Sequence, residues 1–142
     1  MVRTELYKKV APMQVFPGEK NFNPHYMHIQ ISQKYDFLVL NKNLRYVEYQ
    51  PLGMSDTMLQ QYRNSPRSFA EIRLLNLSLS KLPLKYIIRQ CIHLTSSGFL
   101  SGSLFKLIKH SPHKTMTIAA IPLGLILSIY IRRHTSDTRG KS

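Results

Sequence analysis

The residues of this chain that could act as metal ligands or nucleophiles are few and scattered. His25 and His28 form an HxxH pair, but no cysteine or carboxylate follows at the spacing of a metal site. His93 lies among basic residues, and no apolar pocket or second ligand marks it as a haem ligand. Cys91 is the only cysteine, so an intrachain disulfide and a CxxC motif are excluded. We therefore expect no metal and no cofactor of the protein's own.

The composition gives no support for acid–base or nucleophilic catalysis either. The 142 residues include only seven Asp/Glu, which are dispersed along the chain. There is no G-x-S-x-G motif, no glycine loop that would hold a phosphate, and no Cys–His pair with an orienting residue. The sequence therefore predicts a protein that is not an enzyme.

The net charge of +13 is concentrated towards the apolar C-terminal part of the chain. Residues 101–142 hold seven Lys/Arg and one Asp/Glu, which contributes +6 to that total. A basic excess beside an apolar segment favours anionic lipid over nucleic acid, because such a region would meet headgroups and hydrocarbon together. We therefore predict bound anionic phospholipid, such as cardiolipin. The cations expected to contact its headgroups are Lys81, Lys85, Arg89, Lys106, Lys109, Lys114, Arg132 and Arg133.

The elements that position these residues are predicted from the sequence pattern. The predicted fold class is a small, mainly α membrane protein. Two short extended runs flank Asn41-Lys42-Asn43 and predict a hairpin. Beyond them, helical spacing of apolar residues, the Ser65-Pro66 start signal and the break at Pro83 predict helices. The expected elements are a short β-hairpin at 35–49, amphipathic helices at about 55–64, 66–80 and 84–108, and a transmembrane helix at about 112–133.

Composition also divides the chain into four regions. The N-terminal region is rich in Pro, Asn and Tyr, and the long aliphatic residues gather after residue 69. In chain order we expect an irregular, extended partner-binding segment (1–54), an amphipathic helical region (55–110), a transmembrane helix (111–133) and a short basic tail (134–142).

The transmembrane prediction rests on residues 116–131, sixteen residues without a charge. At about 1.5 Å per residue this run is about 24 Å long, against a hydrocarbon core of about 30 Å. Its polar side chains are only Thr117, Ser128 and Tyr130, so a helix here is apolar on nearly every side. A soluble domain of this size would have difficulty covering such a helix, whereas a bilayer supplies apolar surroundings.

Small residues recur along the same segment and predict close packing against another helix. Thr117 precedes Ala120, Gly124 and Ser128, and the last three are spaced by four, as in a small-xxx-small stripe. Pro122 removes one backbone donor and predicts a kink. Upstream, Gly98 and Gly102 form a GxxxG pair, from which we predict a second close helix contact.

Together these features predict a non-catalytic, single-span accessory (supernumerary) subunit of a large membrane complex, with a structural or assembly role. The expected location is the mitochondrial inner membrane, in a respiratory-chain (electron-transport) or ATP synthase complex. Its partners would be other subunits and anionic lipid, without a small-molecule substrate and without nucleic acid. No long apolar leader occurs at the N-terminus, so no cleaved presequence is expected.

Two alternatives stay open. A span close to the C-terminus with basic flanks also suits a tail-anchored protein of the outer mitochondrial or endoplasmic-reticulum membrane. The third hypothesis is a basic RNA- or ribosome-associated protein. Its base-stacking and phosphate contacts would come from Tyr46, Tyr49 and Tyr62 and from Arg45, Arg63 and Arg67.

Overall fold

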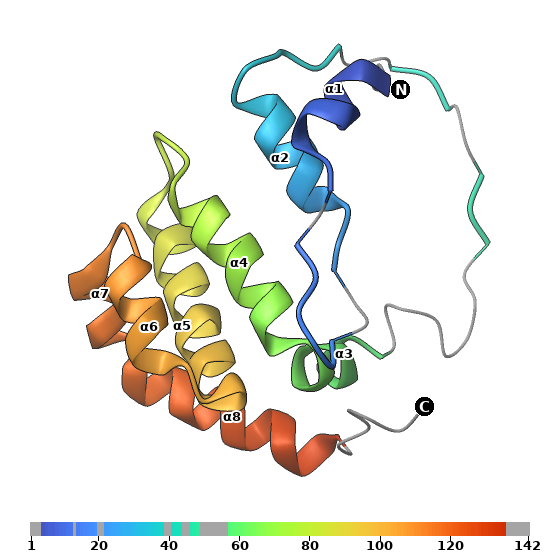
Figure 1. Ribbon diagram of the computed structural model, residues 1–142. Helices are drawn as coiled ribbons and strands as arrows, with labels where there is room; N and C mark the ends of the chain where they lie inside the picture. The colour runs from blue at the N-terminus through green and yellow to red at the C-terminus, as the bar shows by residue number, and fades with distance from the viewer. Residues whose placement is uncertain are drawn as a thin grey trace.

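The computed structural model describes residues 4–12, 14–19, 22–38, 41–43, 46–48 and 57–135. These residues form eight helices and no strand (Figure 1). Two short helices come first, α1 (Thr4–Val10) and α2 (His25–Ser32). The others are α3 (Met58–Asn64), α4 (Pro66–Leu77), α5 (Leu84–Ser101), α6 (Leu104–His110), α7 (Lys114–Ala119) and α8 (Ile121–His134).

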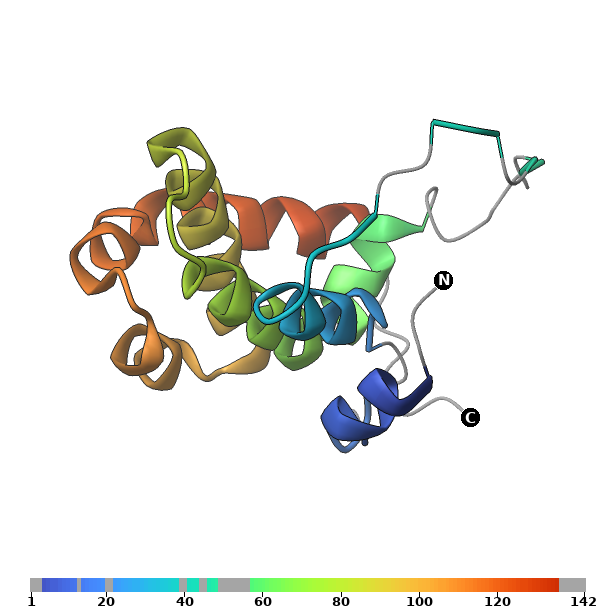
Figure 2. The ribbon, with the colours of Figure 1, turned by 90° about the horizontal axis from the view of Figure 1, so that it is seen from above.

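Helix α5 is the central element of the C-terminal bundle. It contacts α4, α6, α7 and α8, and Figures 1 and 2 show α4 and α8 on different sides of it. The apolar core gathers around its buried residues Ile87, Cys91 and Leu94, with Leu77 from α4 and Leu107 from α6 packed against them.

The ends of α5 follow from the residues beside it. Pro83 precedes the helix in an extended conformation (φ −61°, ψ 140°). Because proline has no backbone N–H, it suits a position just before a helix and not one in its interior. At the other end Gly102 adopts the left-handed conformation (φ +69°), and the backbone N–H of Ser103 donates to the carbonyl oxygen of Gly98 at 3.0 Å. The predicted helix at 84–108 is therefore interrupted at Gly102 and continues as α6.

Helix α4 begins at Pro66, as the Ser-Pro signal predicts, but a residue from a distant part of the chain caps it. The carboxylate of Glu19 accepts hydrogen bonds from the backbone N–H of Arg67 at 2.8 Å and of Ser68 at 2.7 Å. The hydroxyl of Ser68 donates to the same carboxylate at 2.6 Å. The acid therefore satisfies unpaired donors at the positive end of the helix dipole. This contact ties the loop after α1 to the bundle.

The prediction of a transmembrane helix at about 112–133 is wrong. The segment folds as two helices, α7 and α8, separated by a turn at Ala120. Pro122 stands in the first turn of α8 and has no N–H to offer the carbonyl of Ile118, which accounts for the break. Across the described residues, no helix combines the length with the apolarity that a membrane crossing needs. The predicted single-pass membrane location, and with it a single span in the mitochondrial inner membrane, is therefore corrected.

The expectation for the N-terminal region also needs correction. In place of a wholly irregular segment, α1 and α2 form and contact each other, and α2 also contacts α4. Asn23 helps to begin α2, because its side-chain oxygen accepts a hydrogen bond from the N–H of His25 at 2.9 Å. The β-hairpin predicted at 35–49 is absent from the described residues of that range (35–38, 41–43 and 46–48). Its remaining residues lie outside the described part of the chain.

Candidate functional site

The predicted small-residue stripe lies against α5 of the same chain. Thr117, Ala120, Gly124 and Ser128 are all buried. A Cβ atom placed on Gly124 would lie 1.9 Å from Oγ1 of Thr95 and 2.9 Å from the backbone nitrogen of Ser96, so the backbones of α5 and α8 are in direct contact. The hydroxyl of Thr117 approaches Sγ of Cys91 at 3.5 Å, which extends the contact to α7.

The two glycines of the predicted GxxxG pair have separate roles. A Cβ atom on Gly98 would meet the Cα and Cδ1 atoms of Leu104 at 2.9 Å, so Gly98 lets α6 fold back onto α5. Around Gly102 nothing lies within 4 Å of such an atom, and the glycine is required by its positive φ instead. This pair therefore shapes the α5–α6 turn.

All eight cations predicted to contact lipid headgroups are exposed: Lys81, Lys85, Arg89, Lys106, Lys109, Lys114, Arg132 and Arg133. They are distributed over the loop before α5 and over α5, α6, α7 and α8. Arg132 also has a structural contact, since its Nη2 donates to the carbonyl oxygen of Phe99 at 3.0 Å. Between Glu71 and Asp137 the sequence contains no acidic residue at all.

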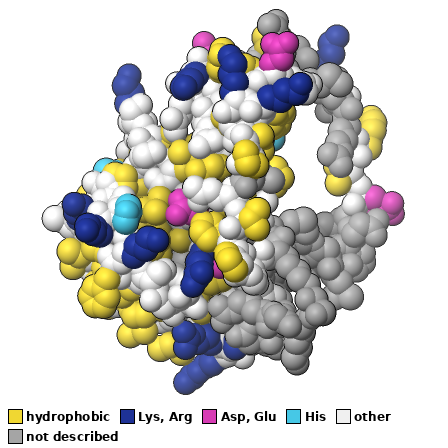
Figure 3. Space-filling view, viewed as in Figure 1, with side chains coloured by type: hydrophobic (Ala, Val, Ile, Leu, Met, Phe, Trp, Pro, Cys, Tyr) yellow, Lys and Arg dark blue, Asp and Glu magenta, His cyan; other side chains and the backbone are white. Residues whose placement is uncertain are grey.

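Apolar side chains that would have faced hydrocarbon in a transmembrane helix are exposed on the side of α8 opposite its contact with α5. We call this surface the outer face of α7–α8. Its members are between 42% and 63% exposed: Ile118, Leu123, Leu125, Ile126, Ile129 and Tyr130. Figure 3 shows hydrophobic side chains along the lower left of the molecule, with Lys and Arg side chains near them. Contiguous apolar surface of this kind is typical of a binding surface.

The positions of these residues follow from helical geometry. Gly124 and Ser128 lie one turn apart and face α5, so Ile126 and Ile129 project from the opposite side of α8. Lys114 begins α7 and Arg133 lies in the last turn of α8, so cations occur at both ends of the outer face. The surface is therefore apolar in its middle and positively charged at its ends.

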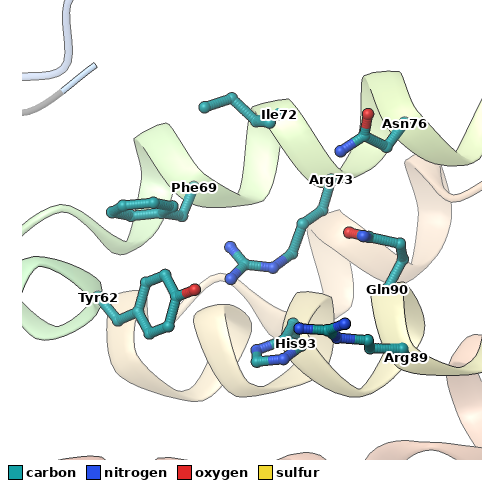
Figure 4. A pocket seen from close by; sticks show the side chains of 8 residues that line it. All are labelled: Tyr62, Phe69, Ile72, Arg73, Asn76, Arg89, Gln90 and His93. Atoms are coloured by element: carbon teal, nitrogen blue, oxygen red, sulfur yellow. The ribbon is translucent and has the colours of Figure 1, made fainter. Parts of the chain in front are cut away.

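A second feature is a polar pocket of about 270 Å³ bounded by α3, α4 and α5 (Figure 4). Its side chains include two arginines, a histidine, two amides and two aromatic rings, but no acid. In chain order the lining residues are Tyr62, Phe69, Ile72, Arg73, Asn76, Arg89, Gln90 and His93.

Arg73 is the most buried charge in this pocket, with only 7% of its surface exposed. Its guanidinium carbon lies 5.0 Å from the ring centroid of Tyr62 and 5.4 Å from that of Phe69, which indicates cation–π contacts. Its Nη1 donates to Oγ of Ser97 at 3.4 Å. Burial lowers the pKa of Arg73 to about 10, while the neighbouring Tyr62 acts in the opposite direction. The side chain therefore stays positively charged at neutral pH.

His93 faces the same pocket from α5. Burial lowers its pKa to about 4, and the positive charges of Arg73 and Arg89 act in the same direction. The imidazole is therefore neutral at pH 7 and offers one donor and one acceptor. Its ring centroid lies 5.9 Å from that of Tyr62.

The other residues that could act as metal ligands or nucleophiles lie on α2 and α5. His25 and His28 both lie on α2, and His28 makes a hydrogen bond with the hydroxyl of Tyr7. Within the described residues, no group of three or more His, Cys, Asp or Glu side chains could hold a metal ion. Cys91 is fully buried, and burial raises the pKa of its thiol. A buried, protonated thiol is a poor nucleophile.

Two residues proposed for RNA contacts have other partners in the fold. Tyr62 lines the pocket, and Nη1 of Arg63 donates to the backbone carbonyl oxygens of Arg132 at 2.7 Å and Thr135 at 2.5 Å. Arg67 is exposed, and so is Tyr46. Arg45 and Tyr49 lie outside the part of the chain that the structure describes, so the RNA alternative stays a prediction.

The pocket was missed in the sequence because its residues come from three helices. One signal was available: Arg73 lies one turn after Phe69 and one turn before Leu77, so a cation stands among apolar residues at helical spacing. Comparisons of the chain with protein-family models, curated proteins and solved structures gave no match. Function is therefore inferred from the chemistry of the described residues.

Proposed function

We propose that this protein is a non-catalytic accessory protein of a membrane-associated assembly, and that it binds an anionic phospholipid surface peripherally. The observation that carries the proposal is the outer face of α7–α8, with apolar side chains in its middle and cations at its ends. The proposed role is structural: the protein would hold other subunits of the assembly at the lipid surface.

The charge pattern favours lipid over a protein partner for this surface. An anionic bilayer offers negative headgroups and apolar chains side by side, and it tolerates a convex helix without a shaped groove. Because no acid occurs between Glu71 and Asp137, the helices from α5 to α8 carry no charge that such a surface would repel. Tyr130, half exposed near the end of α8, also suits the headgroup level.

The expected strength of this interaction is moderate. Each Lys or Arg near an anionic surface contributes about 1 kcal/mol, and each buried CH₂ group about 0.8 kcal/mol. Lys114, Arg133 and a few aliphatic side chains of the outer face would together give reversible binding. Association should therefore depend strongly on the fraction of anionic lipid and on salt.

Vesicle flotation of the full chain tests the proposal. The protein should float with vesicles of phosphatidylcholine mixed with phosphatidylserine, not with pure phosphatidylcholine, and should be released at about 1 M salt, where the Debye length is about 3 Å. The double variant Lys114→Glu/Arg133→Glu should lose binding. Its control is Lys8→Glu/Lys9→Glu on α1, which makes the same change in net charge at other exposed residues.

Substitutions of apolar residues separate the hydrophobic contribution to binding from the electrostatic one. Ile126→Ser/Ile129→Ser should weaken flotation, whereas Val15→Ser/Leu38→Ser, at exposed residues elsewhere, should leave it unchanged. Circular dichroism would establish that all variants fold. Equal binding to neutral vesicles would contradict the proposal. So would an outer-face variant that alters only self-association in sedimentation, since the face would then be a protein interface.

A further inference from the structure

The pocket around Arg73 shares no residue with the outer face of α7–α8, so what binds there is independent of the proposed function. A buried arginine normally has a carboxylate partner, because an uncompensated charge in a low-dielectric interior is costly. Arg73 is only 7% exposed, and its contacts are two aromatic rings and hydroxyl groups. Within the described part of the chain, the groups that shift its pKa include no acid. Among the described residues, the pocket therefore holds a buried cation without a counter-ion.

The surroundings of Arg73 extend this positive character. Figure 4 shows its guanidinium directed between Tyr62 and His93, with Arg89 beside His93. Because His93 is neutral at pH 7, the positive charge in the pocket comes from the two arginines. The amides of Asn76 and Gln90 add further N–H donors at the rim. The donors outnumber the anionic acceptors, as expected for a site that binds an oxyanion.

We propose that this pocket binds the carboxylate of a small organic acid, with Arg73 as the principal contact and Arg89 as a second cation. The guanidinium fork matches a carboxylate, and such charge-assisted hydrogen bonds are stronger than those between neutral groups. The apolar body of the acid would lie against Phe69 and Ile72, which line the same pocket. A cavity of about 270 Å³ is slightly below the range of about 300–1,000 Å³ for drug-sized ligands, which indicates a small molecule.

Inorganic phosphate is the main rival ligand, since it also suits arginine. It is less well matched here, because Tyr62, Phe69 and Ile72 give the pocket an aromatic and aliphatic part that a bare phosphate ion would leave without a partner. An organic acid uses both parts of the wall, the cations through its carboxylate and the rings through its body.

Isothermal titration calorimetry of the full chain at pH 7 tests the assignment with three probes. Benzoate should bind, benzamide, its neutral analogue, should bind much more weakly, and inorganic phosphate should bind more weakly than benzoate. Arg73→Met, which replaces the buried cation by an apolar side chain of similar length, should weaken benzoate binding roughly 10- to 100-fold. The matched control is Arg67→Met, at an exposed arginine on the same helix, which should bind as the parent does.

A second variant keeps the proposal testable if Arg73→Met does not fold. Arg89 is exposed, so Arg89→Ala should fold, as circular dichroism would establish, and should bind benzoate several-fold more weakly. Unchanged benzoate affinity in a folded Arg73→Met or Arg89→Ala variant would overturn the proposal. Equal binding of benzamide and benzoate, or binding of phosphate alone, would overturn the carboxylate assignment.

Discussion

His93 is subject to three influences that all lower its pKa: burial, the charge of Arg73 and the charge of Arg89. Its pKa is about 4 in the folded protein, compared with an ordinary value of 6.5. Between these two values the unfolded chain binds the proton more readily than the folded protein does. The contribution of neutral His93 to stability is therefore fully present above about pH 6.5 and is lost as the pH falls towards 4.

The lowered pKa of His93 in the folded protein predicts how the free energy of unfolding depends on pH. Lowering the pH from 7 to 5 should cost about 1 kcal/mol through His93, after allowance for its partial exposure to solvent. Urea unfolding at the two pH values measures the effect, and His93→Gln should abolish that part of it. If His93→Gln retains the full dependence, the assignment to His93 is wrong.

The contact between α5 and α8 depends on small side chains on both helices. On α5 these are Thr95 and Ser96, both buried, and on α8 the contact centres on Gly124. Thr95 Oγ1 also donates to the carbonyl oxygens of Cys91 at 3.0 Å and Ile92 at 2.9 Å, so its rotation is restrained. An added Cβ on α8 therefore meets atoms that cannot easily move.

Gly124→Ala should consequently destabilise the protein, although alanine is the better helix former by about 1 kcal/mol. Overpacking of this kind costs typically about 1–3 kcal/mol, and we expect a net loss in the free energy of unfolding measured with urea. The double variant Thr95→Ala/Gly124→Ala removes the closest clash, with Oγ1, and should lose less stability than the two single changes added together. A Gly124→Ala protein as stable as the parent would show that the interface has room for a methyl group.

At the level of elements, the sequence predicted what depends on neighbouring residues and missed what depends on distant ones. The helix expected at 66–80 corresponds to α4, because Ser65-Pro66 and the apolar spacing are local signals. The spacing of Ala120, Gly124 and Ser128 predicted close helix packing, but the pattern could not indicate that α5 of the same chain fills that role. The prediction of a transmembrane helix was wrong because it took 116–131 as one continuous helix. Pro122 predicts a kink, whereas the structure has a break between α7 and α8. The Arg73 pocket needed the spatial meeting of α3, α4 and α5, which no local pattern shows.

At the scale of the whole molecule, Glu19 forms a hydrogen-bonded link between the N-terminal part of the chain and the bundle. Its carboxylate caps α4 from 48 residues away, while α2 packs against the same helix. Glu19→Ala would leave the N–H groups of Arg67 and Ser68 without that acceptor. We expect a loss of about 1 kcal/mol in unfolding free energy, as is typical for the loss of a helix cap.

The Glu19→Ala variant should also make the N-terminal segment more susceptible to limited proteolysis than the bundle. Glu48→Ala, at an exposed acid, is the matched control and should change neither property. If Glu19→Ala and Glu48→Ala behave alike, the cap contributes nothing measurable to stability or to holding the segment in place.

Cys91 lies where α5 meets α7, fully enclosed and approached by the hydroxyl of Thr117. Since it is the only cysteine, a thiol reagent added to the native protein has a single target, and it reaches that target only when the helices separate. The labelling rate therefore measures how often the bundle opens at its centre. Cys91 is therefore a built-in reporter of local opening of the native state. A ligand that binds between α4 and α5 and reduces this opening would slow the labelling of Cys91, although it does not contact that residue.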